Sequence, residues 1–444
     1  MKALKLKELV SYGVGDAGQA LIGTLIGFYQ LYYFTDILRL PLGSIAGLFM
    51  LTKILDSASF PLFGLMLDRV SGGVGAFLKW RLWLVIPFFV VSVLLFTYDP
   101  NWSTEFRIIY AYAVVSLFVV LSALISVVYT SLVSSIATQA SDRARLSTVR
   151  FVFAFGASTL ATFFIKYLVD YLGGKTGGGF QSVAFIFSIM ATGLLYITMS
   201  ATRNRTVARP DEPPHGIGSA FAIVRNPMFL GPVVATFFAG LFVAFKSQMT
   251  LYFINYAMNR EDIGNFMLAG GTISCAIGVG LVGFVINRIN RKSLYVVLMA
   301  LNALFVGAIY FVDRSNIYTI IAFHCLNSAL GGACSPVIFS IYSDVVDYLD
   351  ETLNFRAPAL VNSVAMLAGR LGGSLGMVLT PVGLAISQYH PNQQQTSGSI
   401  LGIALMFTLV PGLFAFISAM AMVTYKLTNR ASEDISERLA GEAG

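Results

Sequence analysis

Seven ionisable side chains lie inside long apolar stretches of the sequence, where a charge is costly unless it is paired or used for function. In chain order they are Asp16, Lys53, Asp56, Arg150, Lys166, Lys246 and Arg370. Carboxylates at such positions can bind a cation, and ammonium or guanidinium groups can bind an anion. Lys166 lies near the end of its stretch, four residues before Asp170, so we expect its side chain to extend toward water. The other six comprise four bases and two acids, which indicates either access to water or a bound anion.

Asp56 is the candidate for binding a cation, with Lys53 and Asp16 as further members of a cation-coupling group. Lys53 and Asp56 are three residues apart, so they share a helix face and can pair when no ion is present. A proton needs one acid and Na⁺ prefers several oxygens, so H⁺ and Na⁺ both stay open, with Asp56 as the metal ligand for Na⁺. The structural alternatives are a plain Lys53–Asp56 ion pair and an anchoring role for Asp16 at a glycine-rich helix end.

Five residues are candidates for binding a solute, namely Gln19, Tyr29, Arg150, Lys246 and Arg370. Tyrosine offers both a ring face and a hydroxyl group, which suits a sugar. The polar residues that follow Lys246 indicate a wet cavity. The alternatives are a salt bridge for Arg150 and, for Arg370, close helix packing at its neighbouring glycines.

The amino-acid composition indicates that most of the chain is surrounded by lipid and not by water. Hydrophobic residues make up 56% of the 444 residues, charged residues only 11%, and the mean hydropathy is +0.75. Soluble proteins contain about 25% charged residues. A cytosolic enzyme, a secreted disulfide scaffold and a disordered chain are therefore excluded. The three cysteines lie in apolar stretches and are expected to be buried thiols.

Continuous apolar stretches predict an all-α polytopic membrane protein with twelve spans. The predicted spans are 10–34, 42–66, 82–98, 108–135, 147–170, 181–199, 229–256, 264–286, 294–312, 317–343, 359–385 and 399–424. The basic, proline-rich stretch 201–218 is expected to be a cytoplasmic linker between an N-terminal half, 1–200, and a C-terminal half, 219–425. Residues 426–444 form a charged tail.

The distribution of basic residues predicts the orientation. With both termini in the cytoplasm, 19 of the 29 Lys and Arg residues fall in cytoplasmic segments and five in outer loops. This bias indicates an even number of spans and cytoplasmic termini, as in a bacterial cytoplasmic membrane protein. It also explains the net charge of +7 without a nucleic-acid partner.

A short motif occurs twice, about half the chain length apart. Gly64–Arg69 follows the second span, and Gly283–Arg288 follows the eighth. Both copies lie in predicted cytoplasmic loops, which indicates parallel duplication of a six-helix unit. Ordinary helix capping by an acid and an arginine is the alternative.

Charged residues at the predicted cytoplasmic helix ends are candidates for a gate. They are Asp68, Arg69, Asp142, Arg143, Asp344, Asp347 and Arg356. We expect the acidic group that begins at Asp344 to pair with Arg143, Arg145 and Arg356, and a solvated helix end is the alternative. This group has no histidine beside it, and neither a metalloprotease motif nor a phosphate-binding Walker loop occurs, so an enzyme and an ATP-driven pump are not expected.

Several segments together resemble the major facilitator superfamily, and within it the melibiose-permease type, the glycoside–pentoside–hexuronide:cation symporters. They are Ser11–Asp16, Tyr32–Asp36, Lys53–Asp56 with Pro61 and Gly64, Lys79–Arg81, Asp142–Arg143 with Arg150–Phe151, Tyr342–Tyr348 and Arg370–Ser374. The resemblance implies alternating access and cation-coupled transport of a sugar, with Asp56 at the cation position of the second helix. The coupling ions that it implies are Na⁺, H⁺ or Li⁺. We expect a monomer that has no cofactor, with H⁺ or Na⁺ as its coupling ion.

The sequence departs from that family at five positions. Phe60, Ala20 and Ser126 stand where its best-known members carry aspartates, Ser335 stands near an aromatic position, and Arg370 replaces a lysine. These changes argue against a neutral galactoside held by paired carboxylates. They favour an anionic solute such as a hexuronide or a sulfo-sugar. A lysophospholipid or amphiphile flippase of the same fold is the alternative.

Overall fold

The computed structural model describes residues 6–69, 81–136, 140–174, 177–202, 227–286, 288–353 and 358–427, together with residue 435. Throughout these ranges the regular secondary structure is helical. The chain divides into two compact units, unit 1 from Met1 to Glu212 and unit 2 from Pro213 to Gly444. The division falls inside the predicted linker 201–218, of which only residues 201 and 202 are described.

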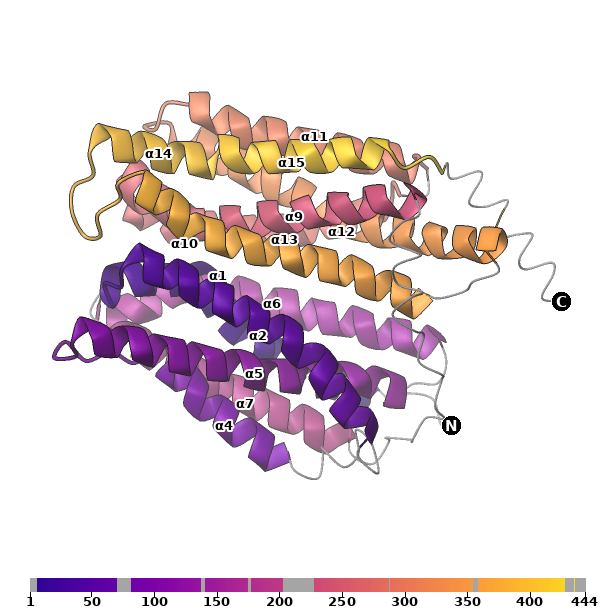
Figure 1. Cartoon of the computed structure of the whole chain (residues 1–444), viewed down its shortest axis with the longest axis horizontal. Helices are drawn as coiled ribbons and strands as arrows, with labels where there is room; N and C mark the ends of the chain where they lie inside the picture. Colours follow the sequence, from indigo (N-terminus) through magenta and orange to yellow (C-terminus); the bar gives the residue numbers. More distant parts are fainter. Residues whose placement is uncertain are drawn as a thin grey trace. The chain divides into compact units, whose positions relative to one another are not determined.

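In its described part, unit 1 contains six successive helical segments (Figure 1). They are α1 (Leu6–Tyr32) with its continuation η1 (Tyr33–Ile37), α2 (Leu42–Arg69), α4 (Arg81–Leu94), α5 (Thr104–Ile136), α6 (Ala140–Leu172) and α7 (Gly177–Thr202). Each overlaps one of the first six predicted spans. The helices α5 and α6 extend beyond their spans because helical hydrogen bonding continues into polar sequence at their ends.

Unit 2 repeats this series over its described residues. Its segments are α9 (Pro227–Tyr252) with η3 (Phe253–Ala257), η4 (Glu261–Ile263) with α10 (Gly264–Val282), α11 (Arg291–Ala308) with η5 (Ile309–Phe311), α12 (Ile317–Leu353), α13 (Pro358–Ile386), and α14 (Ser397–Phe407) followed by α15 (Leu409–Val423). The break between α14 and α15 lies at Thr408. Pro411 explains it, because proline has no amide hydrogen to continue the helical ladder.

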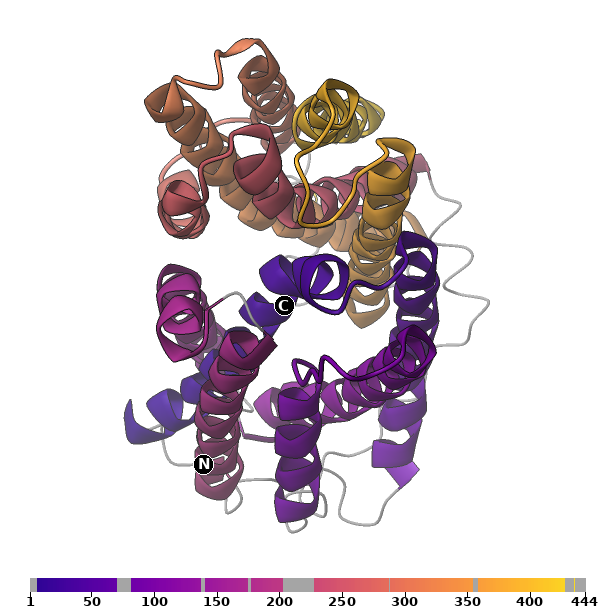
Figure 2. The same ribbon diagram turned by 90° about the vertical axis from the view of Figure 1, so that its left-hand side faces the viewer.

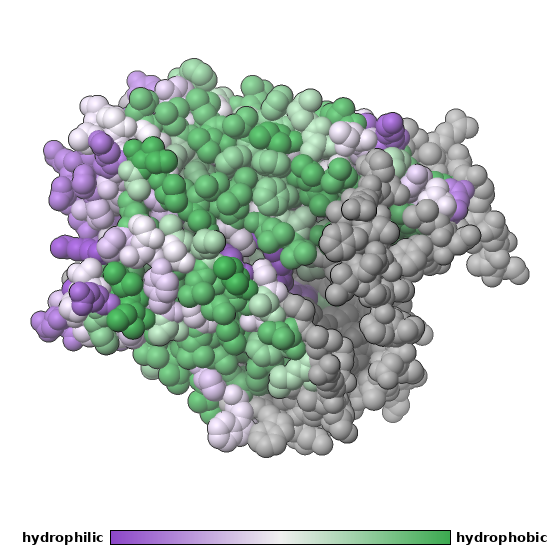
Figure 3. Space-filling model, in the orientation of Figure 1, coloured by the Kyte–Doolittle hydropathy of each residue, from purple (hydrophilic) through white to green (hydrophobic). Residues whose placement is uncertain are grey.

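Nine of the described helices are long and apolar enough to cross a membrane, and Trp83–Leu94 forms a shorter apolar helix. Figure 3 shows apolar atoms along the sides of the helices and hydrophilic atoms gathered near helix ends. Large apolar side chains project outward, as at Trp83 and Ile386, which are 74% and 78% exposed. Such surface is stable against lipid, and the prediction of an all-α membrane protein is confirmed.

The same helix pairs pack together in the two units. In unit 1, α1 packs on α6 and α7, α2 on α5, and α4 on α5 and α7. In unit 2, α9 packs on α13 and α15, α10 on α12, and α11 on α12 and α15. Figure 2 shows the helices of each unit nearly end-on. Because the equivalent pairs follow in chain order, each unit has the arrangement expected from duplication of one six-helix unit.

Glycines allow two helices of unit 2 to approach α9 and α12 closely. A Cβ atom at Gly372 of α13 would lie 1.8 Å from the carbonyl oxygen of Phe237 in α9. A Cβ atom at Gly278 of α10 would lie equally close to the carbonyl oxygen of Ala329 in α12. Small residues at such contacts are typical of membrane helix pairs. The glycines around Arg370 therefore serve the close packing that the sequence indicates.

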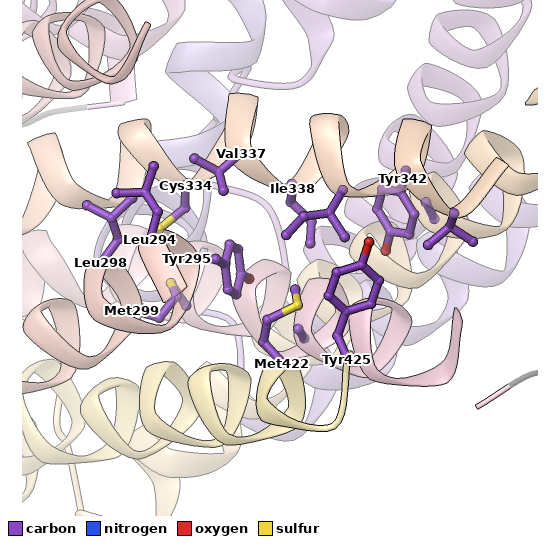
Figure 4. Close-up of a cluster of buried hydrophobic side chains, with 14 of the residues drawn as sticks. Leu294, Tyr295, Leu298, Met299, Cys334, Val337, Ile338, Tyr342, Met422 and Tyr425 are labelled. Carbon is purple, nitrogen blue, oxygen red and sulfur yellow. The ribbon is translucent and has the colours of Figure 1, made fainter. Parts of the chain in front are cut away.

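The core of unit 2 lies between α9, α11, α12 and α15 (Figure 4). Tyr342 donates a hydrogen bond of 3.0 Å to the carbonyl oxygen of Pro232. The hydroxyl groups of Tyr295 and Ser418 lie 3.0 Å apart, and Ser418 donates to the carbonyl oxygen of Ala235. Buried hydroxyl groups with partners avoid the desolvation penalty and fix the helices in register.

Candidate functional site

An ion pair joins α1 to α6 in unit 1. The Nε atom of Arg150 donates to the Oδ2 atom of Asp16, and both side chains are largely buried. The two helices lie close here, since a Cβ atom at Gly13 would come within 2.8 Å of the Val149 and Phe153 side chains. Asp16 therefore compensates the charge of Arg150 inside unit 1. This contact matches the alternative of a salt bridge for Arg150.

Two stacked tyrosines extend this site to α5. The rings of Tyr12 and Tyr129 lie 4.8 Å apart and are almost parallel. Each hydroxyl group donates to the other residue's carbonyl oxygen, at 2.7 Å from Tyr129 and 3.3 Å from Tyr12. The guanidinium of Arg150 lies 5.1 Å from the centre of the Tyr129 ring, within range of a cation–π contact. Arg150 is thus held from two sides.

An unsatisfied amide lies one turn further along α1. Ser126 of α5 donates a hydrogen bond of 3.1 Å to the Oε1 atom of Gln19. The Nε2 atom of Gln19 is buried and has no hydrogen-bond partner within the described ranges. Gln19 is three residues after Asp16, and Ser126 is three residues before Tyr129, so these side chains share neighbouring faces. We call Asp16, Gln19, Ser126, Tyr129 and Arg150 the unit 1 polar site.

A chain of three polar side chains lies inside unit 2. The Nζ atom of Lys246 on α9 donates to the Oδ1 atom of Asn327 on α12. The Nδ2 atom of Asn327 donates to the side-chain and backbone oxygens of Asn302 on α11, at 2.7 and 3.1 Å. Lys246 is only 6% exposed, and both asparagines are more deeply buried. We call these three residues the Lys246 cluster. The two asparagines were not predicted, although each is an isolated amide in an apolar stretch, which was the available signal.

The surroundings of Lys246 are mostly neutral. Its Nζ atom lies 5.9 Å from the centre of the Phe242 ring. Arg260–Asp262 and Arg291–Asp344 are ion pairs of described residues in unit 2, and neither includes Lys246. The site around Lys246 therefore contains a basic group with a neutral acceptor. It is buried rather than part of an open, wet surface.

Tyr29 lies apart from the unit 1 polar site. It is 5% exposed and its ring lies 5.9 Å from that of Phe180. Tyr29 is ten residues beyond Gln19 on α1, a distance of about 15 Å along the helix. The structure therefore does not bring Tyr29 to Arg150, and aromatic packing is its observed role.

Arg370 is exposed on α13. Gly240 of α9 packs against Gly369, so Arg370 lies level with that part of α9. Lys246 is six residues further along α9, about 9 Å along the axis. Arg370 and Lys246 thus belong to the same pair of packed helices, α9 and α13, at different depths.

Lys53 and Asp56 are both half-buried on α2. Of the ion pairs that the described residues form, none joins Lys53 to Asp56, so their predicted pairing is not observed. No group of three or more His, Cys, Asp or Glu residues that could hold a metal occurs in the part of the chain that the structure describes. Na⁺ at Asp56 would therefore need hydroxyl or carbonyl oxygens as further ligands.

The predicted gate is described only in unit 2. Asp344 of α12 accepts a hydrogen bond from Nη1 of Arg291, the first residue of α11. Asn290 caps this helix, because its side chain accepts from the backbone nitrogens of Lys292 and Ser293. The sequence predicts Arg143, Arg145 and Arg356 as partners of Asp344, and the observed partner Arg291 is not among them. Asn290 marks the start of α11 and so places Arg291 in its first turn, but it does not identify Asp344 as the partner.

The remaining gate residues are placed as follows. Asp347 is half-buried on α12. The side chains of Asp68, Arg69, Asp142 and Arg143, and the whole of Arg356, lie outside the described residues, as does the side chain of Arg145. Next to the Arg291–Asp344 pair, burial raises the pKa of the Tyr425 phenol, and the nearby charge of Asp344 adds to this shift. This end of unit 2 is therefore a closely packed polar contact.

Two six-helix units with buried polar sites on their helices define a membrane transporter of the major facilitator fold. The family described as MFS/sugar transport protein matches residues 11–429, and the chain belongs to this family. It is a transporter and not an enzyme.

Three relatives cover almost the whole chain. The chain is 26% identical to the isoprimeverose transporter of Lactiplantibacillus pentosus, over 95% of this chain and 88% of that protein. It is 26% identical to the inner membrane symporter YicJ of Escherichia coli (strain K12), over 99% and 96%. It is 25% identical to a putative sulfoquinovose importer of Salmonella typhimurium, over 98% and 93%.

Solved structures agree at the level of the fold. The crystal structure of the nucleoside transporter NupG superposes with a TM-score of 0.63 at 14% identity, over 95% of this chain and all of that chain. At this identity the likeness establishes the arrangement of helices alone.

Proposed function

We propose that this protein is a cation-coupled symporter that carries an anionic sugar-like solute, such as a hexuronide or a sulfo-sugar, by alternating access. Its family is that of sugar transporters, and similar proteins are named for symport and for a sugar that carries a sulfonate group. Both termini lie in the cytoplasm and the membrane is the bacterial inner membrane, by the distribution of basic residues and by the name of one relative.

The charge balance of the buried residues carries this proposal. Arg150 is compensated by Asp16, whereas Lys246 donates to a neutral amide. A buried ammonium without a negative partner is strongly unfavourable. No described carboxylate of unit 2 pairs with Lys246, and an anionic solute supplies that charge, with Arg370 on the adjoining helix adding to the attraction.

The unit 1 polar site supplies contacts to the sugar hydroxyl groups. Gln19 presents a buried N–H donor that has no partner among the described residues. Ser126 and Tyr129 lie one turn apart on α5, and the Arg150 guanidinium lies over the Tyr129 ring. A donor that is held in place and awaits an acceptor, as Gln19 Nε2 does, gives specificity for a hydroxylated ligand.

Asp56 binds the coupling cation, with Lys53 nearby on the same helix face and Asp16 on α1. A cation within lipid needs a negative charge to offset its lost hydration, and Asp56 provides one. Either H⁺ or Na⁺ satisfies this requirement. Movement of the cytoplasmic ends, including the Arg291–Asp344 contact, would accompany the change of access.

Binding measurements on the purified protein test the anionic cargo. A thermal-shift panel of glucuronate, sulfoquinovose, isoprimeverose and a lysophospholipid, each with and without Na⁺, should give the largest stabilisation with an acidic sugar. Lys246→Ala and Arg370→Ala should each weaken its binding by roughly 10- to 150-fold, because a charge-assisted contact contributes about 1.5–3 kcal/mol.

Lys166→Ala is the matched control. This lysine lies on α6, 16 residues after Arg150 and near the C-terminal end of the helix, and it belongs to neither polar site. The Lys166→Ala variant should bind the acidic sugar with the affinity of the wild type. Strongest binding of isoprimeverose or the lysophospholipid, with normal affinity in both variants, would refute an anionic sugar as the cargo.

A further inference from the structure

Lys246 presents a question that anion binding alone does not answer, namely what charge it carries when no solute is bound. Its buried amine donates to Asn327, and Asn327 gives its amide donors to two oxygens of Asn302. The asparagine is therefore fixed with its oxygen toward the lysine. A neutral amine and an ammonium can both donate to an amide oxygen, so this contact suits either protonation state.

No carboxylate of unit 2 lies at the depth of Lys246 among its described residues. On α12, Asp344 is 17 residues beyond Asn327, about 25 Å along the helix. Asn302 and Cys275 mark the depth of Lys246 on the two other neighbouring segments. Asp313 follows Asn302 by 11 residues, about 16 Å along the chain. Asp262 precedes Cys275 by 13 residues, about 20 Å. An ammonium here has no negative group of its own unit to offset its lost hydration.

The other ionisable groups packed around Lys246 do not supply that charge. Cys275 on α10 and Cys325 on α12 are the thiols that interact with it electrostatically. His324 lies one turn before Asn327, is 5% exposed, and has a buried Nδ1 atom without a described partner. Arg370 is the one ionisable residue of the described part of α13, and α14 and α15 contain none.

We propose that Lys246 is a proton carrier: its amine takes up one proton when an anionic solute binds and releases it when the solute leaves. This rests on the proposed function. The nitrogen lone pair of the neutral amine binds a proton from water, and the resulting ammonium pairs with the acidic group of the solute. On release the proton returns to water and the neutral amine keeps its bond to Asn327. The site therefore moves no net charge, and its proton is separate from the cation at Asp56.

Proton uptake on binding is the measurement that isolates this step. Calorimetric titration of the purified full-length protein with glucuronate and with sulfoquinovose, in buffers of different ionisation enthalpy, gives the protons bound per solute. In the neutral to mildly alkaline range we expect up to about one proton per bound anion.

Lys246→Arg is the decisive variant, since a guanidinium stays protonated at every accessible pH. It should still bind the anionic sugar but lose the proton uptake. Lys246→Met should lose most of the affinity together with the uptake. Lys166→Met and His324→Gln should retain both, since neither is the proton acceptor.

The outcomes separate this inference from the proposed function. Tight binding of an acidic sugar with no proton uptake in the wild type overturns the inference alone. Uptake that is undiminished in Lys246→Arg, or that is lost in His324→Gln, also overturns it. A neutral sugar as the preferred ligand overturns the proposed function, and the inference with it.

Discussion

Arg150 and Lys246 differ in the charge of the group that accepts their hydrogen bond. Arg150 donates to a carboxylate and also covers the face of a tyrosine ring. Lys246 donates to an amide. The Arg150–Asp16 pair is neutral overall, so it needs no further ion to remain formed. The amide that accepts from Lys246 carries no negative charge. We therefore propose that the acidic group of the solute binds at Lys246.

A substitution at Gln19 tests whether its side-chain amide contacts the sugar. Gln19→Ala removes both the unpartnered N–H donor and the acceptor for Ser126. Loss of a neutral hydrogen bond costs about 0.5–1.5 kcal/mol, so the affinity for the solute should fall about 2- to 12-fold. Calorimetry or transport competition would measure this change.

Gln181→Ala serves as the control for that variant. Gln181 lies on α7 and donates to Thr97, away from the unit 1 polar site. It should bind the solute normally. If Gln19→Ala behaved in the same way, the amide would have no part in recognition.

The sequence identifies which charged residues lie inside the helices, whereas their roles in binding stay predictions. Charge in an apolar stretch is a strong signal, and it led to Asp16, Arg150 and Lys246. Their partners were harder to predict, because an ion pair between α1 and α6 depends on how the helices pack. Tyr29 packs near Phe180, since a tyrosine suited to a sugar also suits an aromatic core, and its part in solute binding stays a prediction.

The close packing of α9 and α13 should depend on the glycines at their contact. Gly372→Ala would place a methyl group 1.8 Å from the carbonyl oxygen of Phe237, so the two helices must separate. Overpacking of this kind destabilises a protein by about 1–3 kcal/mol. The midpoint of thermal unfolding in detergent should therefore fall.

Gly373→Ala is the matched control for this effect. A Cβ atom there would lie 3.8 Å from the nearest atom, which is ordinary van der Waals contact. Its unfolding midpoint should match that of the wild type. Equal midpoints for the two variants would show that the α9–α13 contact does not depend on glycine.

The positions of the helices were predictable because long apolar stretches have few ways to satisfy their backbone in lipid. Each predicted span falls on an observed helical segment. The ends were less certain, as α4 shows by ending at Leu94 rather than near residue 98. The break at Thr408 was not predicted, although Pro411 was visible in the sequence.

At the scale of the whole molecule, the two units share one packing order but carry different chemistry. Unit 1 contains the Asp16–Arg150 pair and, on α2, the carboxylate of Asp56. The described membrane-depth part of unit 2 contains Lys246 with its two asparagines. Under the proposed function, cation binding falls to one copy of the repeat and binding of the acidic group to the other.

Uphill transport tests this account most directly. Reconstituted into proteoliposomes with equal pH and equal Na⁺ on both sides, the wild type should accumulate glucuronate or sulfoquinovose when an inside-negative membrane potential is imposed, because the proton on Lys246 moves no net charge and the cation at Asp56 does. Asp56→Asn should abolish accumulation, because the carboxylate that binds the coupling ion is gone, while solute exchange at equal concentrations on both sides continues. Undiminished accumulation by Asp56→Asn would contradict the account, and so would a wild type that moves these sugars only down their own gradient.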